Sequence, residues 1–154
     1  MSTEQIVNFI QVSERIASSG QPAEHQFKSI AKANFEVIIN LSMPNSENAI
    51  PEEGNIVTAH GMTYVHIPVP FNSPTIDHLR KFLKIMAAFS EHKVWVHCVV
   101  NYRVSAFLYH YQLIVQSATE EQARKVILPS WQPNEVWQQF MAIPREEVAL
   151  QQFI

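Results

Sequence analysis

VWVHCVVNYRVSAFL, residues 94–108, contains the only cysteine of the chain and predicts three consecutive elements. The apolar run at 94–97 is typical of a buried strand, and the apolar spacing from Arg103 onward predicts a helix. A tight loop that begins at Cys98 joins the two. A strand that enters a helix through a short loop points backbone N–H groups at one spot, and the helix dipole makes that spot attract anions.

Cys98 and Arg103 carry the chemistry of this loop. A cysteine at such a point is shifted toward the thiolate, which is the nucleophilic form. The arginine lies five positions later, and its guanidinium can hold two oxygens of a phosphate or sulfate group. We therefore expect the sulfur of Cys98 to attack an oxyanion ester that Arg103 holds.

The composition restricts the class of protein. The chain has 154 residues, of which 47% are hydrophobic and 16% are charged, and these values are typical of one folded domain. We expect a single domain over residues 1–154. The formal net charge is −3 and no run of Lys or Arg is present, so we expect no nucleic-acid partner.

The apolar stretches, the single cysteine and the histidine spacing indicate the compartment of the protein and its need for a cofactor. Its apolar stretches are too short to span a bilayer, and residues 1–5 lack the features of a signal peptide. A single cysteine fits a reducing compartment, so we expect a cytoplasmic protein without a membrane partner. The seven histidines show no His-Glu-x-x-His or similar spacing, so we expect no metal and no cofactor.

Strand-like and helix-like segments alternate along the chain, which predicts an α/β fold with a mostly parallel sheet covered by helices. The predicted strands lie at 15–19, 35–41, 64–69 and 94–97. The predicted helices lie at 23–33, from 51 or 52 to 60 with Gly61 as the stop, from a Ser73 N-cap with Pro74 in the first turn, from 103, at 119–128, at 133–141 and in a last turn from Pro144.

This order of elements resembles the cysteine-dependent tyrosine and dual-specificity phosphatases. It is most similar to a bacterial branch, the phosphatase-like domain of beta-lactamase-hydrolase-like proteins. The resemblance runs from about residue 16 to 140 and implies a three-layer α/β fold with a central sheet of four to five strands. It rests on the order and spacing of Ser19-Gly20-Gln21-Pro22, residues 37–41, residues 61–69, and His97-Cys98 with Arg103.

The resemblance also implies roles for individual residues. Cys98 would be the nucleophile that forms a phosphocysteine, and Arg103 would clamp the transition state. His97 would support the thiolate indirectly, by ordering the loop and not by touching the substrate. Gln21 would line the mouth of the pocket, although as part of a turn it needs no function. The phosphoryl oxygens would be held by the backbone N–H groups of Val99, Val100, Asn101, Tyr102 and Arg103.

The loop departs from the common phosphatase pattern. It has four residues between cysteine and arginine instead of five, a spacing shared with the bacterial branch and with rhodanese-like sulfurtransferases. Asn101 replaces a glycine, and asparagine tolerates a positive φ better than other non-glycine residues. Val104 stands where many relatives have a Ser or Thr that helps the sulfur leave, and Ser105 follows one place later.

Asp77 is the only aspartate of the chain and a candidate general acid. Other possible donors, none with a spacing argument, are Glu47, Glu52, His60 and His66. The usual place of that acid, just after the strand at 64–69, holds Pro70-Phe71-Asn72. Asp77 falls in the first turn of the following predicted helix, where the dipole favours an acid without any catalytic duty. Without a general acid, hydrolysis of esters with poor leaving groups loses a factor of about 10²–10⁴.

Each interpretation has an alternative. The structural alternatives are that Cys98 is a buried thiol without a chemical role and that His97 is a core histidine bonded to backbone carbonyls. For function, we expect a cysteine-dependent phosphatase that acts on a phosphorylated protein or small molecule. The alternatives are a non-catalytic phosphate-binding module and a sulfurtransferase that uses the same cysteine. Hydrolysis of an aryl phosphate and transfer of sulfur from thiosulfate to cyanide separate the three.

Overall fold

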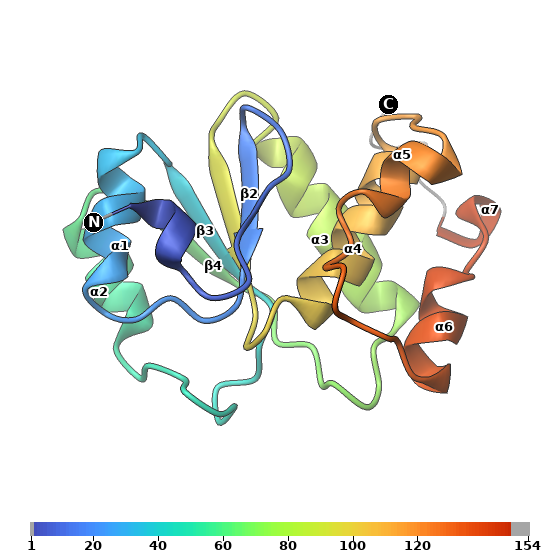
Figure 1. Ribbon diagram of the computed structural model, residues 1–154, viewed down its shortest axis with the longest axis horizontal. Helices are drawn as coiled ribbons and strands as arrows, with labels where there is room; N and C mark the ends of the chain where they lie inside the picture. Colours follow the sequence, from blue (N-terminus) through green and yellow to red (C-terminus); the bar gives the residue numbers. More distant parts are fainter. Residues whose placement is uncertain (1, 149–154) are drawn as a thin grey trace.

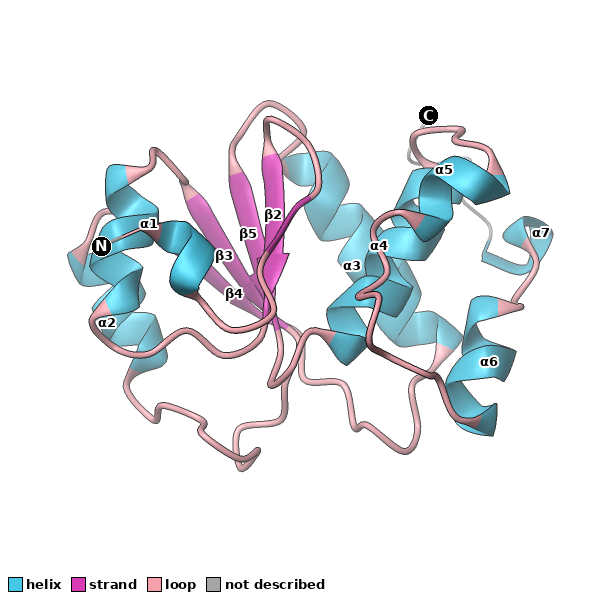
Figure 2. Ribbon diagram, viewed as in Figure 1, coloured by secondary structure: helices cyan, strands magenta, loops and turns pink. Residues whose placement is uncertain are grey.

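The computed structural model describes residues 2–148, which form an α/β fold around a five-stranded sheet (Figures 1 and 2). The strands are β1 Ile10–Gln11, β2 Ile16–Ser19, β3 Val37–Asn40, β4 Thr63–His66 and β5 Val94–His97. The helices are the short 3-10 helix η1 Thr3–Gln5, α1 Gln26–Lys32, α2 Glu53–Ala59, α3 Ile76–Ala88, α4 Tyr102–Ile114, α5 Glu120–Arg124, α6 Glu135–Met141 and α7 Arg145–Val148.

The sheet is mostly parallel, as the alternation of segments predicted. Its strand order is β1-β2-β5-β3-β4, and only the short edge strand β1 runs antiparallel to its neighbour. Strand β5 lies in the centre, where His97 pairs with Ser19 of β2 on one side and Asn40 of β3 on the other. Because β2, β3 and β5 run in the same direction, their carboxyl ends meet at one edge of the sheet.

Helices cover both faces of the sheet, which confirms the three-layer fold. Successive side chains of a strand point to opposite faces, and β5 follows this alternation. Trp95 packs with Phe27 of α1 and Val57 of α2 in one apolar cluster. Val94 and Val96 belong to the other cluster, together with residues of α3 and α4. Figure 1 shows α1 and α2 on one side of the sheet and α3 and α4 on the other.

The predicted N-terminus of α3 was wrong by two residues. Thr75, not Ser73, is the N-cap: its hydroxyl accepts a hydrogen bond from the His78 N–H, and the His78 side chain accepts one from the Thr75 N–H. This reciprocal cap satisfies two backbone donors at once. The predicted Gly61 stop is confirmed, since α2 ends at Ala59 and Gly61 has a φ of +82°.

The segments at the carboxyl edge of the sheet are the ones that bear on function. The loop after β5, the turn after β2 and the start of α2 all lie there. Within residues 2–148, each helix is either too short or too polar to cross a membrane.

Candidate active site

Residues 98–101 form the tight loop between β5 and α4 that the sequence predicts. Cys98 opens the loop, is 1% exposed and has a free thiol. Asn101 closes it with a φ of 72°, in the left-handed region. The expected positive φ at Asn101 is therefore confirmed. Helix α4 begins at Tyr102, one residue before the predicted start.

The side chain of Asn101 ties the loop to distant parts of the chain. Its Nδ2 donates to the Asn8 carbonyl at 2.8 Å and to the Ser18 hydroxyl at 3.1 Å. The contact with Asn8 is reciprocal, because the Asn8 Nδ2 donates to the Val100 carbonyl at 2.9 Å. These contacts fasten the loop to β2 and to the segment before β1.

Gly20 allows β2 to approach the loop closely. A Cβ placed on Gly20 would lie 2.4 Å from the Val99 carbonyl oxygen, so no larger residue fits without displacing backbone. The next residue uses this proximity, since the Gln21 N–H donates to the same Val99 oxygen at 2.9 Å. A close backbone approach of this kind explains a glycine in the Ser19–Pro22 segment.

The inner side of the loop presents backbone donors. Among residues 2–148, no group accepts a hydrogen bond from the N–H groups of Val99 to Arg103. The carbonyls of Val99 and Val100, by contrast, accept bonds from Gln21 and Asn8. Outward carbonyls with free amides at a helix start are the arrangement that binds an anion.

Arg103 lies inside the protein instead of on the helix surface. It is 5% exposed, and its Nη1 donates to the Val69 carbonyl at 2.9 Å. Its Nε is buried and faces no acceptor among the described residues. The guanidinium carbon lies 5.7 Å from the centre of the Phe71 ring, within the range of a cation–π contact. Arg103 is therefore not a solvent-exposed arginine at the start of α4.

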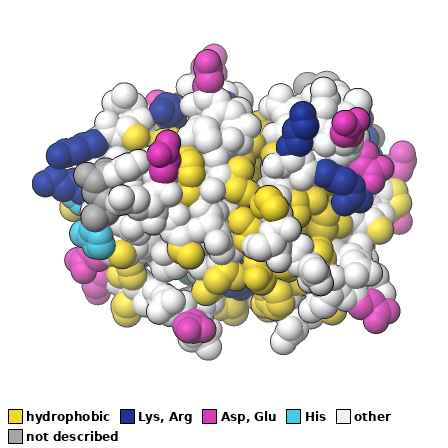
Figure 3. Space-filling view, in the orientation of Figure 1, with side chains coloured by type: hydrophobic (Ala, Val, Ile, Leu, Met, Phe, Trp, Pro, Cys, Tyr) yellow, Lys and Arg dark blue, Asp and Glu magenta, His cyan; other side chains and the backbone are white. Residues whose placement is uncertain are grey.

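Aromatic side chains line one side of the loop. Tyr102 stacks on Trp131 at 5.2 Å between ring centres with 10° between the planes, and Phe71 lies 6.5 Å from Tyr102. Figure 3 shows apolar side chains gathered near the middle of one face, between the sheet and the half of the molecule that contains α4 to α6.

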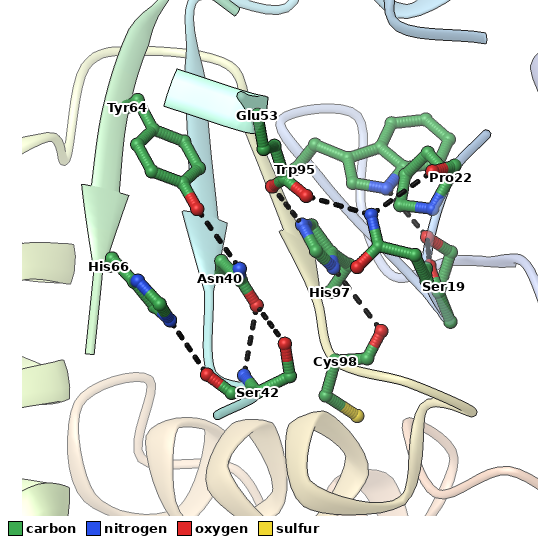
Figure 4. A network of polar contacts seen from close by, with 12 residues as sticks. Ser19, Pro22, Asn40, Ser42, Glu53, Tyr64, His66, Trp95, His97 and Cys98 are labelled. Carbon is green, nitrogen blue, oxygen red and sulfur yellow. Dashed lines mark hydrogen bonds and ion pairs between the residues drawn. The ribbon is translucent and has the colours of Figure 1, made fainter. Parts of the chain in front are cut away.

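His97 takes part in a buried network with Glu53 and Gln21 (Figure 4). Its Nε2 lies 2.6 Å from Glu53 Oε2, and its Nδ1 lies 3.2 Å from the Cys98 carbonyl oxygen. Gln21 Nε2 donates to the other carboxylate oxygen of Glu53 at 2.7 Å and to the Pro22 carbonyl at 3.0 Å. His97 is 0% and Glu53 2% exposed. Gln21 thus holds Glu53, and its amide is buried.

Glu53 is ionised more readily than an ordinary glutamate. Burial alone would raise its pKa, but the charge of His97 and the hydrogen bonds from His97 and Gln21 outweigh that penalty and lower the pKa of the carboxyl. His66 contributes to the same lowering.

A second polar group lies beside this network. Asn40 Nδ2 donates to the Tyr64 hydroxyl at 3.0 Å, and Asn40 Oδ1 accepts from the Ser42 hydroxyl at 2.7 Å. Burial, opposed by the Asn40 hydrogen bond and aided by the nearby Glu53 charge, raises the pKa of Tyr64 to about 12. A cavity of about 140 Å³ adjoins Asn40, Tyr64 and Glu53.

Ser105 and Asp77 each have hydrogen-bond or ion-pair partners other than the Cys98 thiol. The Ser105 hydroxyl accepts from the Leu128 N–H at 3.0 Å and contacts Asn101 Oδ1 at 3.5 Å, so it supports the loop. The Asp77 side chain is 66% exposed and pairs with Lys81 at 3.0 Å. A hydrogen bond from Lys81 and its charge lower the pKa of Asp77, which favours the carboxylate over the acid.

Sequence reasoning missed Glu53. It lies 44 residues before His97 and carries no motif of its own. Only the docking of α2 against the sheet brings its carboxylate to the end of β5. Within the described part of the chain, no group of three or more His, Cys, Asp or Glu side chains is placed to hold a metal ion.

The comparisons with known proteins agree on one family. A family model described as "DSP-PTPase phosphatase fused to NAD+ Kinase" matches residues 2–142. A DUF442 protein of Shewanella putrefaciens CN-32 is 34% identical, with a TM-score of 0.81 over 96% of this chain and 94% of that one. The active form of Tk-PTP shares the fold, with a TM-score of 0.77 at 18% identity over 90% of this chain and 97% of that one.

A curated relative matches over a shorter range. The Beta-lactamase hydrolase-like protein of Agrobacterium fabrum is 33% identical over 92 residues, which cover 58% of this chain and 21% of that protein. The chain therefore spans about a fifth of the length of this relative.

Proposed function

The chain belongs to the DSP-PTPase phosphatase family, and from this premise we propose that it hydrolyses a phosphomonoester through a phosphocysteine at Cys98. The substrate would be a phosphorylated protein or small molecule. The domain would comprise residues 1–154.

The reaction would proceed in two displacements. The Cys98 thiolate attacks phosphorus, so that a sulfur–phosphorus bond forms as the ester oxygen leaves and takes up a proton. Water then attacks the phosphocysteine, inorganic phosphate leaves, and the thiolate is restored. Arg103 and the backbone N–H groups of the loop would stabilise the negative charge on the phosphoryl oxygens in both steps.

Arg103 is the observation that carries this proposal. A buried guanidinium whose Nε donor has no acceptor among residues 2–148 is costly unless an anion joins it. The N–H groups of residues 99–103 offer a set of donors on the same loop. Cys98 lies at the start of that loop, so an anion held there would meet the only sulfur nucleophile of the chain.

Hydrolysis of p-nitrophenyl phosphate by purified protein tests the proposal. We expect turnover in the wild type, loss of turnover in Cys98→Ser, and a phosphocysteine trapped by acid quench and seen by mass spectrometry. Circular dichroism of Cys98→Ser controls for folding. Hydrolysis at the wild-type rate by the folded Cys98→Ser variant would contradict the proposal.

The exposure of Asp77 favours a second candidate, a phosphate-binding module without turnover. Such a module would bind inorganic phosphate in an Arg103-dependent way and hydrolyse no phosphoester. Calorimetric titration with phosphate, run beside the activity assay, separates the two candidates. Any Cys98-dependent hydrolysis removes the second one.

A further inference from the structure

Both ring nitrogens of His97 face hydrogen-bond acceptors. Nδ1 lies 3.2 Å from the carbonyl oxygen of Cys98, and a carbonyl can only accept. Nε2 lies 2.6 Å from Glu53 Oε2. If Glu53 is ionised, Nε2 must donate as well, and the ring then carries two protons and a positive charge.

The surroundings of Glu53 favour its ionised form. Its other oxygen, Oε1, already accepts a hydrogen bond from Gln21 Nε2 at 2.7 Å, and such bonds stabilise a carboxylate. The pair is almost wholly removed from solvent, since both side chains are at most 3% exposed. A short, charge-assisted bond between buried groups fits a carboxylate and an imidazolium.

We propose that Glu53 is a positioning residue that keeps His97 doubly protonated, so that an imidazolium is held against the backbone of Cys98. In Figure 4 the His97 ring lies between the Glu53 carboxylate and Cys98, and the sulfur points away from Glu53. The positive charge is therefore nearer to Cys98 than the negative charge that balances it. The net effect on Cys98 is to stabilise the thiolate.

Few other titratable groups face the pair. From β4, His66 and Tyr64 interact with the Glu53 charge. From α1, the Phe27 ring meets the His97 ring edge-on at 6.3 Å between centres and carries no charge. The Cys98 thiol follows on the loop after β5. The state of His97 thus depends mainly on Glu53.

The charge of the His97 ring can be measured without any substrate. A two-bond ¹H–¹⁵N correlation spectrum of the wild-type protein at neutral pH distinguishes an imidazolium from either neutral tautomer. We expect both His97 nitrogens to be protonated. An unprotonated ring nitrogen would overturn the proposal, and this holds even if every variant failed to fold.

Glu53→Gln is a nearly isosteric test. The new amide can donate to an unprotonated Nε2 and accept from Gln21, so the hydrogen bonds persist while the charge is lost. We expect the His97 ring to become neutral and the rate of Cys98 alkylation by iodoacetamide at pH 7 to fall about tenfold. Glu52→Gln, at the exposed neighbouring position, is the matched control and should change neither quantity.

The consequence for catalysis rests on the proposed function. A failure of the proposed role of Glu53 can be distinguished from a failure of the proposed phosphatase activity. If Glu53 acts as proposed, the acid limb of the kcat/KM profile moves to higher pH in Glu53→Gln, as the alkylation profile does. An unchanged ring charge and an unchanged alkylation rate in folded Glu53→Gln would refute the role of Glu53. Absence of any Cys98-dependent turnover would refute the phosphatase while leaving the two measurements on Glu53 valid.

Discussion

Arg103 has more hydrogen-bond donors than the described residues offer it acceptors. One nitrogen bonds the Val69 carbonyl, and the Phe71 ring lies beneath the guanidinium, but the buried Nε faces no acceptor among residues 2–148. An unsatisfied buried donor costs about 1–3 kcal/mol, and more when the group is charged. A bound oxyanion would remove this cost, which supports the proposed role of Arg103 in holding an anion.

Asp77→Asn should leave hydrolysis of an aryl phosphate within about twofold of the wild-type rate. Removing a general acid slows a reaction by about 10²–10⁴-fold only if that group donates a proton in the reaction, and we expect that Asp77 does not. The Asp77 carboxylate is exposed and paired with Lys81, and the lowered pKa keeps it ionised at neutral pH. The measurement is kcat/KM of the variant for p-nitrophenyl phosphate and for an alkyl phosphate.

The comparison of the two substrates makes the Asp77 test decisive. We expect the wild type to hydrolyse the alkyl phosphate far more slowly, since its leaving group needs a proton. Lys81→Met, which removes the partner of Asp77 on the same exposed turn of α3, is the control. Its kcat/KM for both substrates should stay as close to the wild-type values as that of Asp77→Asn. A fall of a hundredfold or more in Asp77→Asn alone would show that the carboxyl reaches the site by a rearrangement of α3.

Side chains that act within a few residues of one another were predictable from the sequence. Cys98 and Asn101 lie in the loop after β5 and Arg103 lies in the first turn of α4, and a strand–loop–helix pattern constrains where each can lie. Glu53 was not predictable, because its meeting with His97 depends on tertiary docking across 44 residues. The expectation that His97 orders the loop is consistent with its contact to the Cys98 carbonyl, but the carboxylate behind it left no local signal.

Among the elements, the loop of residues 98–101 depends on one left-handed residue. Asn101 holds a φ of 72° at the N-cap of α4 and donates two side-chain hydrogen bonds from the same position. The first property redirects the chain into the helix, and the second ties the loop to β2. Glycine would supply only the positive φ and not the side-chain hydrogen bonds. Asparagine supplies both, and this explains why it can replace the glycine of the common phosphatase pattern.

Asn101→Ala should destabilise the protein by roughly 2–4 kcal/mol, since it combines the strain of a left-handed alanine with buried partners left unsatisfied. Asn34→Ala is the matched control: Asn34 has a φ of 71° after α1 and an exposed side chain, so only the strain of about 1–2 kcal/mol applies. Urea unfolding of both variants measures the difference. Equal losses would mean that the Asn101 side-chain bonds contribute nothing to stability.

The ends of elements show where local rules compete. Ser73-Pro74 and Thr75 both offer an N-cap for α3, and Thr75 is the N-cap because His78 completes a reciprocal cap with it. The helix predicted at 119–128 is observed only at Glu120–Arg124, with Thr119 as the N-cap. Element types were predictable from apolar spacing, whereas boundaries depend on side-chain hydrogen bonds that a spacing pattern does not resolve.

At the scale of the molecule, β5 joins the two apolar clusters. Trp95 belongs to one and Val94 and Val96 to the other, so neither helical layer has a core independent of the sheet. We therefore expect the described residues to unfold in one cooperative transition. The assignment of residues 1–154 to a single domain stays a prediction, since residues 149–154 lie outside the described part.

Acid should weaken this transition in two stages. His110 on α4 is buried and contacts the Phe140 carbonyl of α6 at 2.8 Å. Burial lowers its pKa, and the Phe140 hydrogen bond only partly offsets this. Below about pH 6.5 the unfolded chain therefore binds a proton that the folded protein resists. The lowered pKa of Glu53 acts in the same direction below about pH 4.5.

His110→Gln should reduce the first stage, because the amide can still donate to Phe140 but cannot titrate. The lowered pKa of His78 leaves a smaller slope in the same direction. In the wild type, the free energy of unfolding should fall as the pH drops below 6.5, by at most about 1.4 kcal/mol per pH unit for the His110 proton. Urea unfolding at a series of pH values from 8 to 5 measures this slope, and His25→Gln at an exposed position is the control. A slope that persists unchanged in His110→Gln would locate the acid sensitivity in another group, since a side chain that cannot titrate contributes no difference in bound protons between the folded and unfolded states.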